Sequence, residues 1–239
     1  MILKKSMPES VSPMDEVFDS VFARVGRHFP MEAIELDPEI AKPKSMLKLL
    51  DATHYNWEAD RFRKLFGMRF RVKLPPIDQL NTILYPEPVY DTPIFLFFML
   101  VTKRKLIAHL NVYCPFDDEA YLARHVTPLV EILNRYPSFE CDDRYPEWMR
   151  QYRQPCSIYG MFGRDRFDDL QHCAQDYLEH YLQQAKEADK ITDTTSLEQV
   201  GAFHEQFIDD IRTQDKAQGM IAKMIGKHKA RRIFYEITT

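Results

Sequence analysis

The chain of 239 residues is long enough to bury a substantial core, and its composition argues against several classes of protein. Hydrophobic residues make up 45% of the sequence, aromatic residues 13%, and the formal net charge is −4. The 7 glycines form neither a GxGxxG nor a GxxxxGKS/T motif, so a dinucleotide-binding or P-loop enzyme is not expected.

Cysteine usage and apolar runs indicate a compartment. The closest pair of the four cysteines, Cys141 and Cys156, is separated by 15 positions, which offers no CxxC-type metal site and suits free thiols in a reducing cytosol. The N-terminus lacks a signal-peptide apolar stretch, and no apolar run approaches the ~20 residues that span a bilayer. We therefore expect a cytoplasmic protein without a membrane or metal partner.

Positive charge is concentrated in two segments although the whole chain is acidic. Six cations and no acid lie in Arg61–Ile77, and again six cations and no acid in Lys216–Tyr235. These segments are either solvated faces or a basic surface for an anionic partner, such as an acidic protein or a carboxylate ligand. No nucleic-acid partner is expected, because the protein as a whole is acidic.

The first predicted elements follow a loose arm over residues 1–12. Apolar positions three and four apart predict a helix over Pro13–Phe29. Residues 30–60 carry mixed signals. Partial alternation predicts a strand over Arg61–Lys73, with one charged face, and a short strand follows at Leu80–Tyr85.

A hairpin at the centre of the sequence indicates the fold class. Ile94–Val101 and Leu106–Tyr113 read as two strands joined by the charged turn TKRK. The first strand is apolar without interruption, which predicts that both of its faces are covered. Helices must then lie on both sides, so we expect an α/β fold, a three-layer α/β/α sandwich with a central antiparallel sheet.

The second half of the chain is predicted to be mostly helical. Helical spacing covers Asp118–Arg135 and Asp165–Lys190, and a further helix capped by Thr195 or Ser196 follows. Another helix is expected over roughly 216–227, and RRIFYEI (231–237) is expected to close the sheet as a strand. We treat residues 1–239 as a single domain.

Three stretches together resemble the ferredoxin-dependent bilin reductases. LYPEPVYDTPIF (Leu84–Phe95) is similar to a proline- and tyrosine-rich signature of that family, and Pro146–Trp148 resembles its PEW segment. Gln214–Met220, followed by RRIFYEI, resembles its C-terminal helical segment and closing strand, with Gln218 where the family pattern has arginine. The resemblance covers roughly residues 50–239.

The resemblance implies a function and a set of partners. The family reduces open-chain tetrapyrroles (bilins) such as biliverdin, bound between the sheet and the C-terminal helices. A 2Fe–2S ferredoxin delivers the electrons and the protein supplies protons, so no tightly bound cofactor is expected. The implied partners are ferredoxin, biliverdin or a related bilin, and a haem oxygenase as a candidate upstream enzyme.

The chain departs from the phycocyanobilin-forming branch of the family at two central positions. Phe98 stands where that branch has an aspartate, and Asn81 stands where it has a histidine. Asp215 matches an aspartate of the family's C-terminal segment, and we expect it to be the proton donor. Its alternative role is to cap a helix. Asn81 is expected to orient the ligand, because an amide hydrogen-bonds but does not act as an acid.

Five further residues are expected to contact the bilin. Lys216 matches a family lysine that pairs with a propionate, and Arg150 and Arg153 are candidate propionate partners because arginine binds carboxylates bidentately. Phe98 is expected to form the pocket floor, unless a one-residue slip puts Phe97 there instead. His109, on the second strand of the hairpin, could titrate or could be structural.

Two other functions stay open. The chain could be a non-catalytic bilin- or haem-binding carrier or sensor that kept the reductase fold. It could also be an oligomerising structural relative whose pocket is filled by aromatic side chains. Loss of turnover in an Asp215→Asn variant that still binds ligand would favour the reductase, and failure to bind any bilin would favour the structural relative.

Overall fold

A computed structural model describes residues 12–45, 49–139 and 145–239, built around one antiparallel sheet of seven strands. The strands follow one another across the sheet in chain order. The expected arm over residues 1–12 falls almost wholly outside the described residues. The strands are β1 (Met31–Ala33), β2 (Leu50–Ala59), β3 (Phe62–Val72), β4 (Ile77–Pro86), β5 (Ile94–Thr102), β6 (Lys105–Tyr113) and β7 (Ile158–Gly163).

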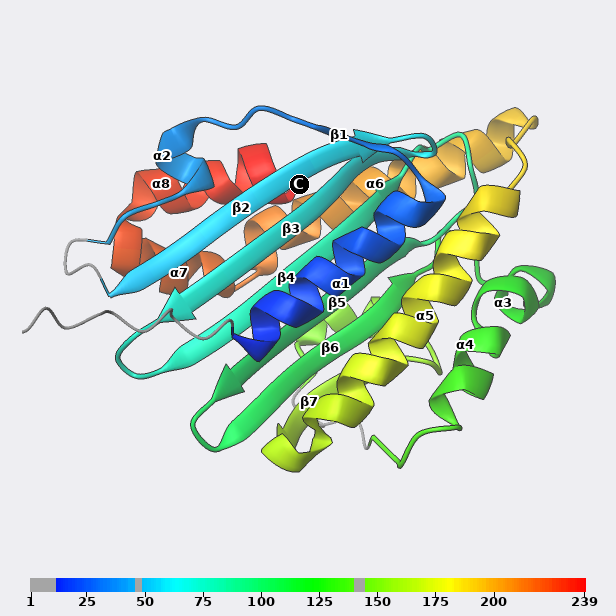
Figure 1. Ribbon diagram of the computed structural model, residues 1–239. Coiled ribbons are helices and arrows are strands. Elements are labelled where there is room, and N and C mark those ends of the chain that lie inside the picture. Colours follow the sequence, from blue (N-terminus) through cyan, green and yellow to red (C-terminus); the bar gives the residue numbers. More distant parts are fainter. Residues whose placement is uncertain (1–11, 46–48, 140–144) are drawn as a thin grey trace, which may run out of the picture.

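Helices cover both faces of the sheet, which confirms the expected α/β/α sandwich. In Figure 1, α1 (Pro13–His28) and α5 (Phe167–Glu187) lie in front of the sheet, with α3 (Glu119–His125) and α4 (Thr127–Leu133) beside α5. Behind the sheet lie α6, α7 and α8. The bounds on that side are α6 (Thr194–Gln214), α7 (Ala217–Ile225), α8 (Lys227–Arg232), and, near the start of the chain, α2 (Pro38–Ala41).

The uninterrupted apolar run of β5 places apolar side chains on both faces of the sheet. Phe95 and Phe97 belong to the core beneath α1 and α5, whereas Leu96 and Phe98 pack into the core beneath α6 and α8. This alternation is the period of a strand, and it requires a helical layer on each side. It also settles the register, because Phe98 and not Phe97 faces the C-terminal helices.

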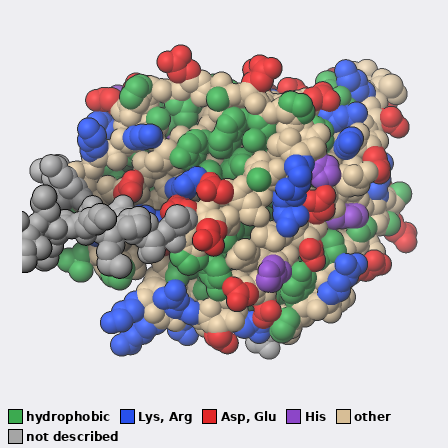
Figure 2. Space-filling view, viewed as in Figure 1, with side chains coloured by type: hydrophobic (Ala, Val, Ile, Leu, Met, Phe, Trp, Pro, Cys, Tyr) green, Lys and Arg blue, Asp and Glu red, His purple; other side chains and the backbone are tan. Residues whose placement is uncertain are grey.

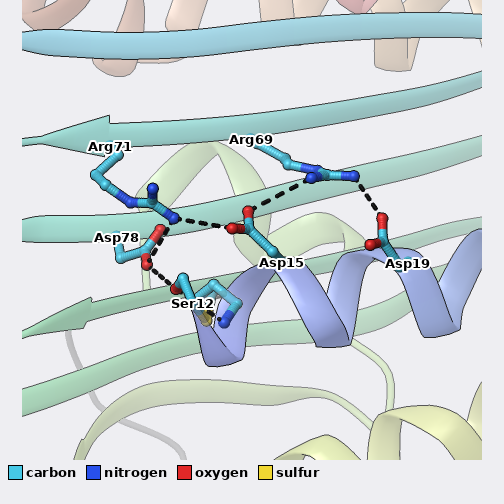
Figure 3. A network of polar contacts seen from close by, with 7 residues as sticks. Ser12, Asp15, Asp19, Arg69, Arg71 and Asp78 are labelled. Atoms are coloured by element: carbon cyan, nitrogen blue, oxygen red, sulfur yellow. Dashed lines mark hydrogen bonds and ion pairs between the residues drawn. The ribbon is translucent and has the colours of Figure 1, made fainter. Parts of the chain in front are cut away.

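Charged residues of β3 and β4 hold α1 against the sheet. Figure 3 shows Arg69 reaching Asp15 and Asp19 of α1, and Arg71 reaching Asp15 and Asp78. The Arg71–Asp15 distance is 3.2 Å. Part of the first cationic segment is therefore paired with acids of the same chain. In Figure 2, acidic and basic side chains are intermingled on this face, so it presents no field of one sign.

Several predicted elements are confirmed. The helices expected over Pro13–Phe29, Asp165–Lys190 and roughly 216–227 correspond to α1, α5 and α7, and the hairpin corresponds to β5 and β6. The strand predicted at Arg61–Lys73 is β3. Residues 30–60, where the sequence signals are mixed, contain β1, α2 and β2.

The closing segment RRIFYEI is not a strand, so that prediction is wrong. Arg231 and Arg232 end α8, and a π-helical turn follows as η3 (Ile233–Thr238). The buried positions Ile233, Phe234 and Ile237 follow a helical rather than an alternating spacing, and they fill the core beneath α6. Apolar runs this short do not separate strand from helix by composition alone.

Two helix boundaries also differ from the predictions. The helix expected over Asp118–Arg135 is split into α3 and α4, because Pro128 has no N–H to donate to the carbonyl of Arg124. The side chain of Gln184 donates to that carbonyl instead. At the start of α6 the capping residue is Asp193 rather than Thr195 or Ser196, since its carboxylate accepts from the Ser196 backbone N–H at 2.8 Å.

Candidate active site

A cavity of about 760 Å³ lies between the sheet and the helices behind it. This volume is typical of sites for sizeable organic ligands. Its floor comes from β3 to β7, and its other walls come from α6, α7, η3 and the 3-10 helix η1 (Glu147–Tyr152). Polar or charged groups among its described lining residues are Gln79, Asn81, His109, Tyr113, Glu147, Trp148, Tyr159, Gln214, Asp215, Lys216 and Thr238.

One cross-strand row forms the centre of the floor. The strand register places Met68 opposite Asn81, Asn81 opposite Phe98, Phe98 opposite His109, and His109 opposite Tyr159. Directly opposed residues on one face of an antiparallel sheet have side chains in contact range. Asn81 and Phe98, the two positions at which the sequence departs from the phycocyanobilin-forming branch, are therefore immediate neighbours at the centre of the cavity.

Asn81 brings an unused acceptor into this row. Its side-chain oxygen Oδ1 is buried and has no hydrogen-bond partner within the described residues. A buried polar atom without a partner costs about 1–3 kcal/mol. A ligand N–H that reached this oxygen would remove that cost. Phe98 contributes an apolar, partly buried ring next to it, so this part of the floor holds no acid.

Asp215 supplies a carboxyl group from the helical wall. It lies between α6 and α7, lines the cavity and is half-buried. Burial raises the pKa of this carboxyl above its usual value, and the hydrogen bond from the backbone N–H of Ala217, at 2.8 Å, partly opposes the rise. The hydrogen bond from Ala217 is a capping contact at the start of α7, whereas proton donation by Asp215 stays a prediction.

The three predicted propionate partners occupy different places. Lys216 lines the cavity and is exposed at its rim. Arg150 and Arg153 do not line it. Arg150 pairs with Glu147 at 2.9 Å, and the guanidinium of exposed Arg153 lies 5.8 Å from the centre of the Tyr145 ring. The roles of these arginines stay predictions, whereas the position of Lys216 suits a ligand carboxylate.

His109 is buried in the floor and is surrounded by tyrosines. Its Nε2 lies 3.2 Å from the hydroxyl of Tyr145 and 3.4 Å from that of Tyr113. Burial lowers the pKa of His109 to about 3, so the imidazole is neutral near pH 7. Tyr113 lines the cavity but was not singled out from the sequence. Its spacing of four from His109 on a strand, which places both on one face, is the signal that could have found it.

The proline- and tyrosine-rich signature lies outside the cavity. Asp91 pairs with Arg124 and lies 4.0 Å from His125, and the buried Tyr90 ring lies 4.8 Å from the Arg61 guanidinium. These contacts are structural, and they anchor the entry into β5. The other two stretches that carried the resemblance do contribute to the site, because Pro146–Trp148 and Gln214–Ala217 line the cavity.

Two further observations bear on cofactors and location. Across the part of the chain that the structure describes, no group of three or more histidine, cysteine or acidic side chains is arranged to hold a metal ion. In the same described ranges, no helix combines the length and the apolar character needed to cross a membrane.

The class of this protein follows from its fold, an α/β/α sandwich with a cavity of about 760 Å³ behind the sheet, together with a match to a protein family. A family model described as ferredoxin-dependent bilin reductase matches residues 18–237. The chain belongs to this family.

Curated relatives within this class are distant. The chain is 24% identical over 163 residues to the 15,16-dihydrobiliverdin:ferredoxin oxidoreductase of Nostoc punctiforme and 27% identical over 165 residues to that of Gloeobacter violaceus. Each match covers 65% of this chain and 65% of the relative, so a third of each relative is unmatched. This chain is also 23% identical to the phycoerythrobilin:ferredoxin oxidoreductase of Nostoc punctiforme, over 62% of this chain and 59% of the relative.

A solved structure supports the fold. The chain superimposes on tomato phytochromobilin synthase, crystallised in complex with biliverdin, with a TM-score of 0.82. The match covers 92% of this chain and 80% of that one at 16% identity. At this identity the likeness establishes the fold.

Proposed function

We propose that this protein reduces an open-chain tetrapyrrole of the biliverdin type, with electrons from a 2Fe–2S ferredoxin and with Asp215 as proton donor. The observation that carries the proposal is a half-buried carboxyl with a raised pKa, facing a cavity that is otherwise largely apolar and aromatic. Family membership and the named activities of the relatives support the substrate class and the electron donor.

The proposed chemistry couples each electron to a proton. An electron from ferredoxin makes the bilin more basic, and the carboxyl of Asp215 gives it a proton and then regains one from solvent. A raised pKa keeps more of this carboxyl protonated near neutral pH than an exposed aspartate would be. Phe98 has no proton to give, and we assign the donor role to Asp215 on the helical wall.

Two other residues would hold the substrate. The Oδ1 of Asn81, for which the described part of the chain offers no partner, would accept a hydrogen bond from a pyrrole N–H of the bilin. Lys216, at the rim, would pair with a propionate while that group stays in contact with water. A flat apolar ligand with two carboxylates fits a cavity whose cation is at its edge.

The outer side of α7 suits an acidic electron donor. Its inner side lines the cavity with Ala217 and Ile221. Its outer side exposes Met220, at 60%, close in sequence to Lys216 and Lys223. We place the ferredoxin contact here, because a basic surface with a small apolar centre steers and then holds an acidic protein next to the substrate.

The test is an Asp215→Asn variant assayed without oxygen. Asparagine keeps the shape and accepts the hydrogen bond from Ala217, but it cannot donate a proton as an acid. We expect biliverdin affinity within about threefold of the wild type and turnover with reduced ferredoxin about 100-fold lower, a general-acid effect.

Asp209→Asn is the matched control, because it removes the same charge from an exposed position on α6. Turnover of Asp215→Asn at the wild-type rate would refute Asp215 as donor. Binding without any reduction, by the wild type as well, would instead indicate a carrier.

A further inference from the structure

The sheet floor carries a hydrogen-bonded group that the proposed chemistry does not use. His109 and Tyr113 both line the cavity and are joined through Nε2 and the tyrosine hydroxyl at 3.4 Å. Tyr145 contacts the same nitrogen at 3.2 Å. The rings of Tyr113, Tyr145 and Tyr159 all stand nearly perpendicular to the imidazole, at 80°, 81° and 82°. The position of His109 is therefore fixed from several sides.

This group is uncharged near pH 7. Burial lowers the pKa of His109, and burial, followed by the neighbouring Tyr145, raises that of Tyr113. Its side chains thus carry neutral N–H and O–H groups, together with nitrogen and oxygen acceptors, in a closely packed part of the floor where His109 is 4% exposed and Tyr113 0%. A carboxylate placed here would lose its hydration without meeting a cation. Lys216 is the single lysine or arginine among the described lining residues, and it lies on the helical wall.

A bilin has one kind of neutral polar group that suits this uncharged part of the floor. Its end rings are lactams, each with a carbonyl oxygen and a ring N–H, whereas its propionates are charged. We infer that His109 and Tyr113 form a lactam-binding site in the floor, which holds one end ring beside Phe98 and so fixes how the bilin is oriented. This inference rests on the proposed function for the identity of the ligand.

The first part of the test measures binding without any reductant. Biliverdin is titrated into Tyr113→Phe, which removes only the hydroxyl oxygen, and into His109→Leu. Loss of one neutral hydrogen bond is worth about 1 kcal/mol, so we expect each dissociation constant to rise about fivefold. The bound absorption spectrum should also shift, since a lactam hydrogen bond acts on the conjugated system.

The second part uses biliverdin dimethyl ester, which keeps both lactams and lacks both carboxylates. The effects of Tyr113→Phe and His109→Leu should persist with the ester. The effect of Lys216→Met should appear with biliverdin and vanish with the ester. This ligand comparison separates the lactam site from the propionate site.

Tyr181→Phe is the matched control for Tyr113→Phe. Its hydroxyl is also buried and donates to the Pro93 carbonyl at 2.8 Å, but it lies in the core on the other side of the sheet. This variant should bind both compounds within about twofold of the wild type.

Wild-type affinity of both floor variants for both compounds would overturn the inference. So would an effect that disappears with the ester, because the floor would then recognise carboxylates. Because no ferredoxin is added, these outcomes are independent of turnover. A protein that shows the expected pattern but reduces nothing would refute the proposed reaction and keep the lactam site.

Discussion

Three buried histidines lie on the cavity side of the sheet or on α6, and burial lowers the pKa of each. The pKa of His54 falls to about 4, that of His109 to about 3 and that of His204 to about 4. His54 keeps a hydrogen bond to the Ile40 carbonyl at 2.8 Å, whereas neither ring nitrogen of His204 has a partner within the described residues. All three are neutral in the folded protein near pH 7.

Acidification is therefore expected to destabilise the fold. In the unfolded chain these histidines take up protons below pH 6.5, but in the folded chain only near pH 3–4. The unfolded state binds more protons in that window, so the free energy of unfolding falls as pH drops from about 6.5 towards 4. At about 1.4 kcal/mol per proton and pH unit, these three histidines should together contribute a slope of about 4 kcal/mol per pH unit near pH 5.

Urea unfolding at pH 7, 6 and 5 measures this slope. Asp215 contributes to this slope with the opposite sign, because its raised pKa makes the folded state bind more protons than the unfolded state. Its contribution therefore reduces the total slope. In a His204→Gln variant, the slope should be smaller by the contribution of about one proton. Equal stability at pH 7 and pH 5 would show that these histidines are not buried in a neutral form.

Single residues show where sequence reasoning reached its limit. The structure gathers around one cavity five site residues that the sequence predicted: Asn81, Phe98, His109, Asp215 and Lys216. Tyr113 was missed because a tyrosine on a strand is usually a packing residue. The placement of Arg150 and Arg153 outside the cavity depends on the local turn of η1, which no sequence pattern specified.

At the scale of elements, the packing of α1 on the sheet depends on one glycine. Gly67 lies on β3 beneath this helix, and a Cβ there would come within 2.8 Å of the Phe22 ring and 2.9 Å of the Phe18 ring. Real Cβ atoms essentially never approach other atoms so closely, so either α1 or its aromatic side chains must shift. Overpacking of a well-filled core typically costs about 1–3 kcal/mol.

Gly67→Ala should lower the free energy of unfolding by that amount. Gly201→Ala, on α6, makes the same chemical change where no atom lies within 4 Å of the new Cβ, and it should stabilise the protein by up to about 1 kcal/mol. Thermal or urea unfolding of both variants measures the two changes in the free energy of unfolding, which should have opposite signs. A neutral Gly67→Ala would mean that α1 packs less tightly than described.

Elements were predictable where periodicity was strong. The alternation in β3 and the helical stripes of α1 and α5 carried enough apolar positions to fix their type. β2 was not predictable in this way, because its inward positions include the polar residues His54 and Asn56. Both are buried, and their hydrogen-bond partners are the carbonyl oxygens of Ile40 and Ile237. The closing segment was misassigned because its short apolar run suits either a strand or a helix.

At the scale of the whole molecule, the two faces of the sheet have different characters. The face beneath α1 and α5 packs into a hydrophobic core, and the charged residues of the first cationic segment that face α1 are partly neutralised by acids of that helix. The opposite face holds the cavity, and two exposed lysines of the second cationic segment lie beside it, Lys216 just before α7 and Lys223 within α7. A single domain stays a prediction, which one cooperative unfolding transition would support.

The measurement that tests the central claim most directly is an anaerobic spectrum of the wild-type protein with biliverdin, before and after reduced ferredoxin is added. We predict a shifted bilin spectrum on binding, followed by its conversion to the spectrum of a reduced bilin when electrons arrive. A bound spectrum that does not change under reduced ferredoxin would contradict the claim that this cavity is an active site.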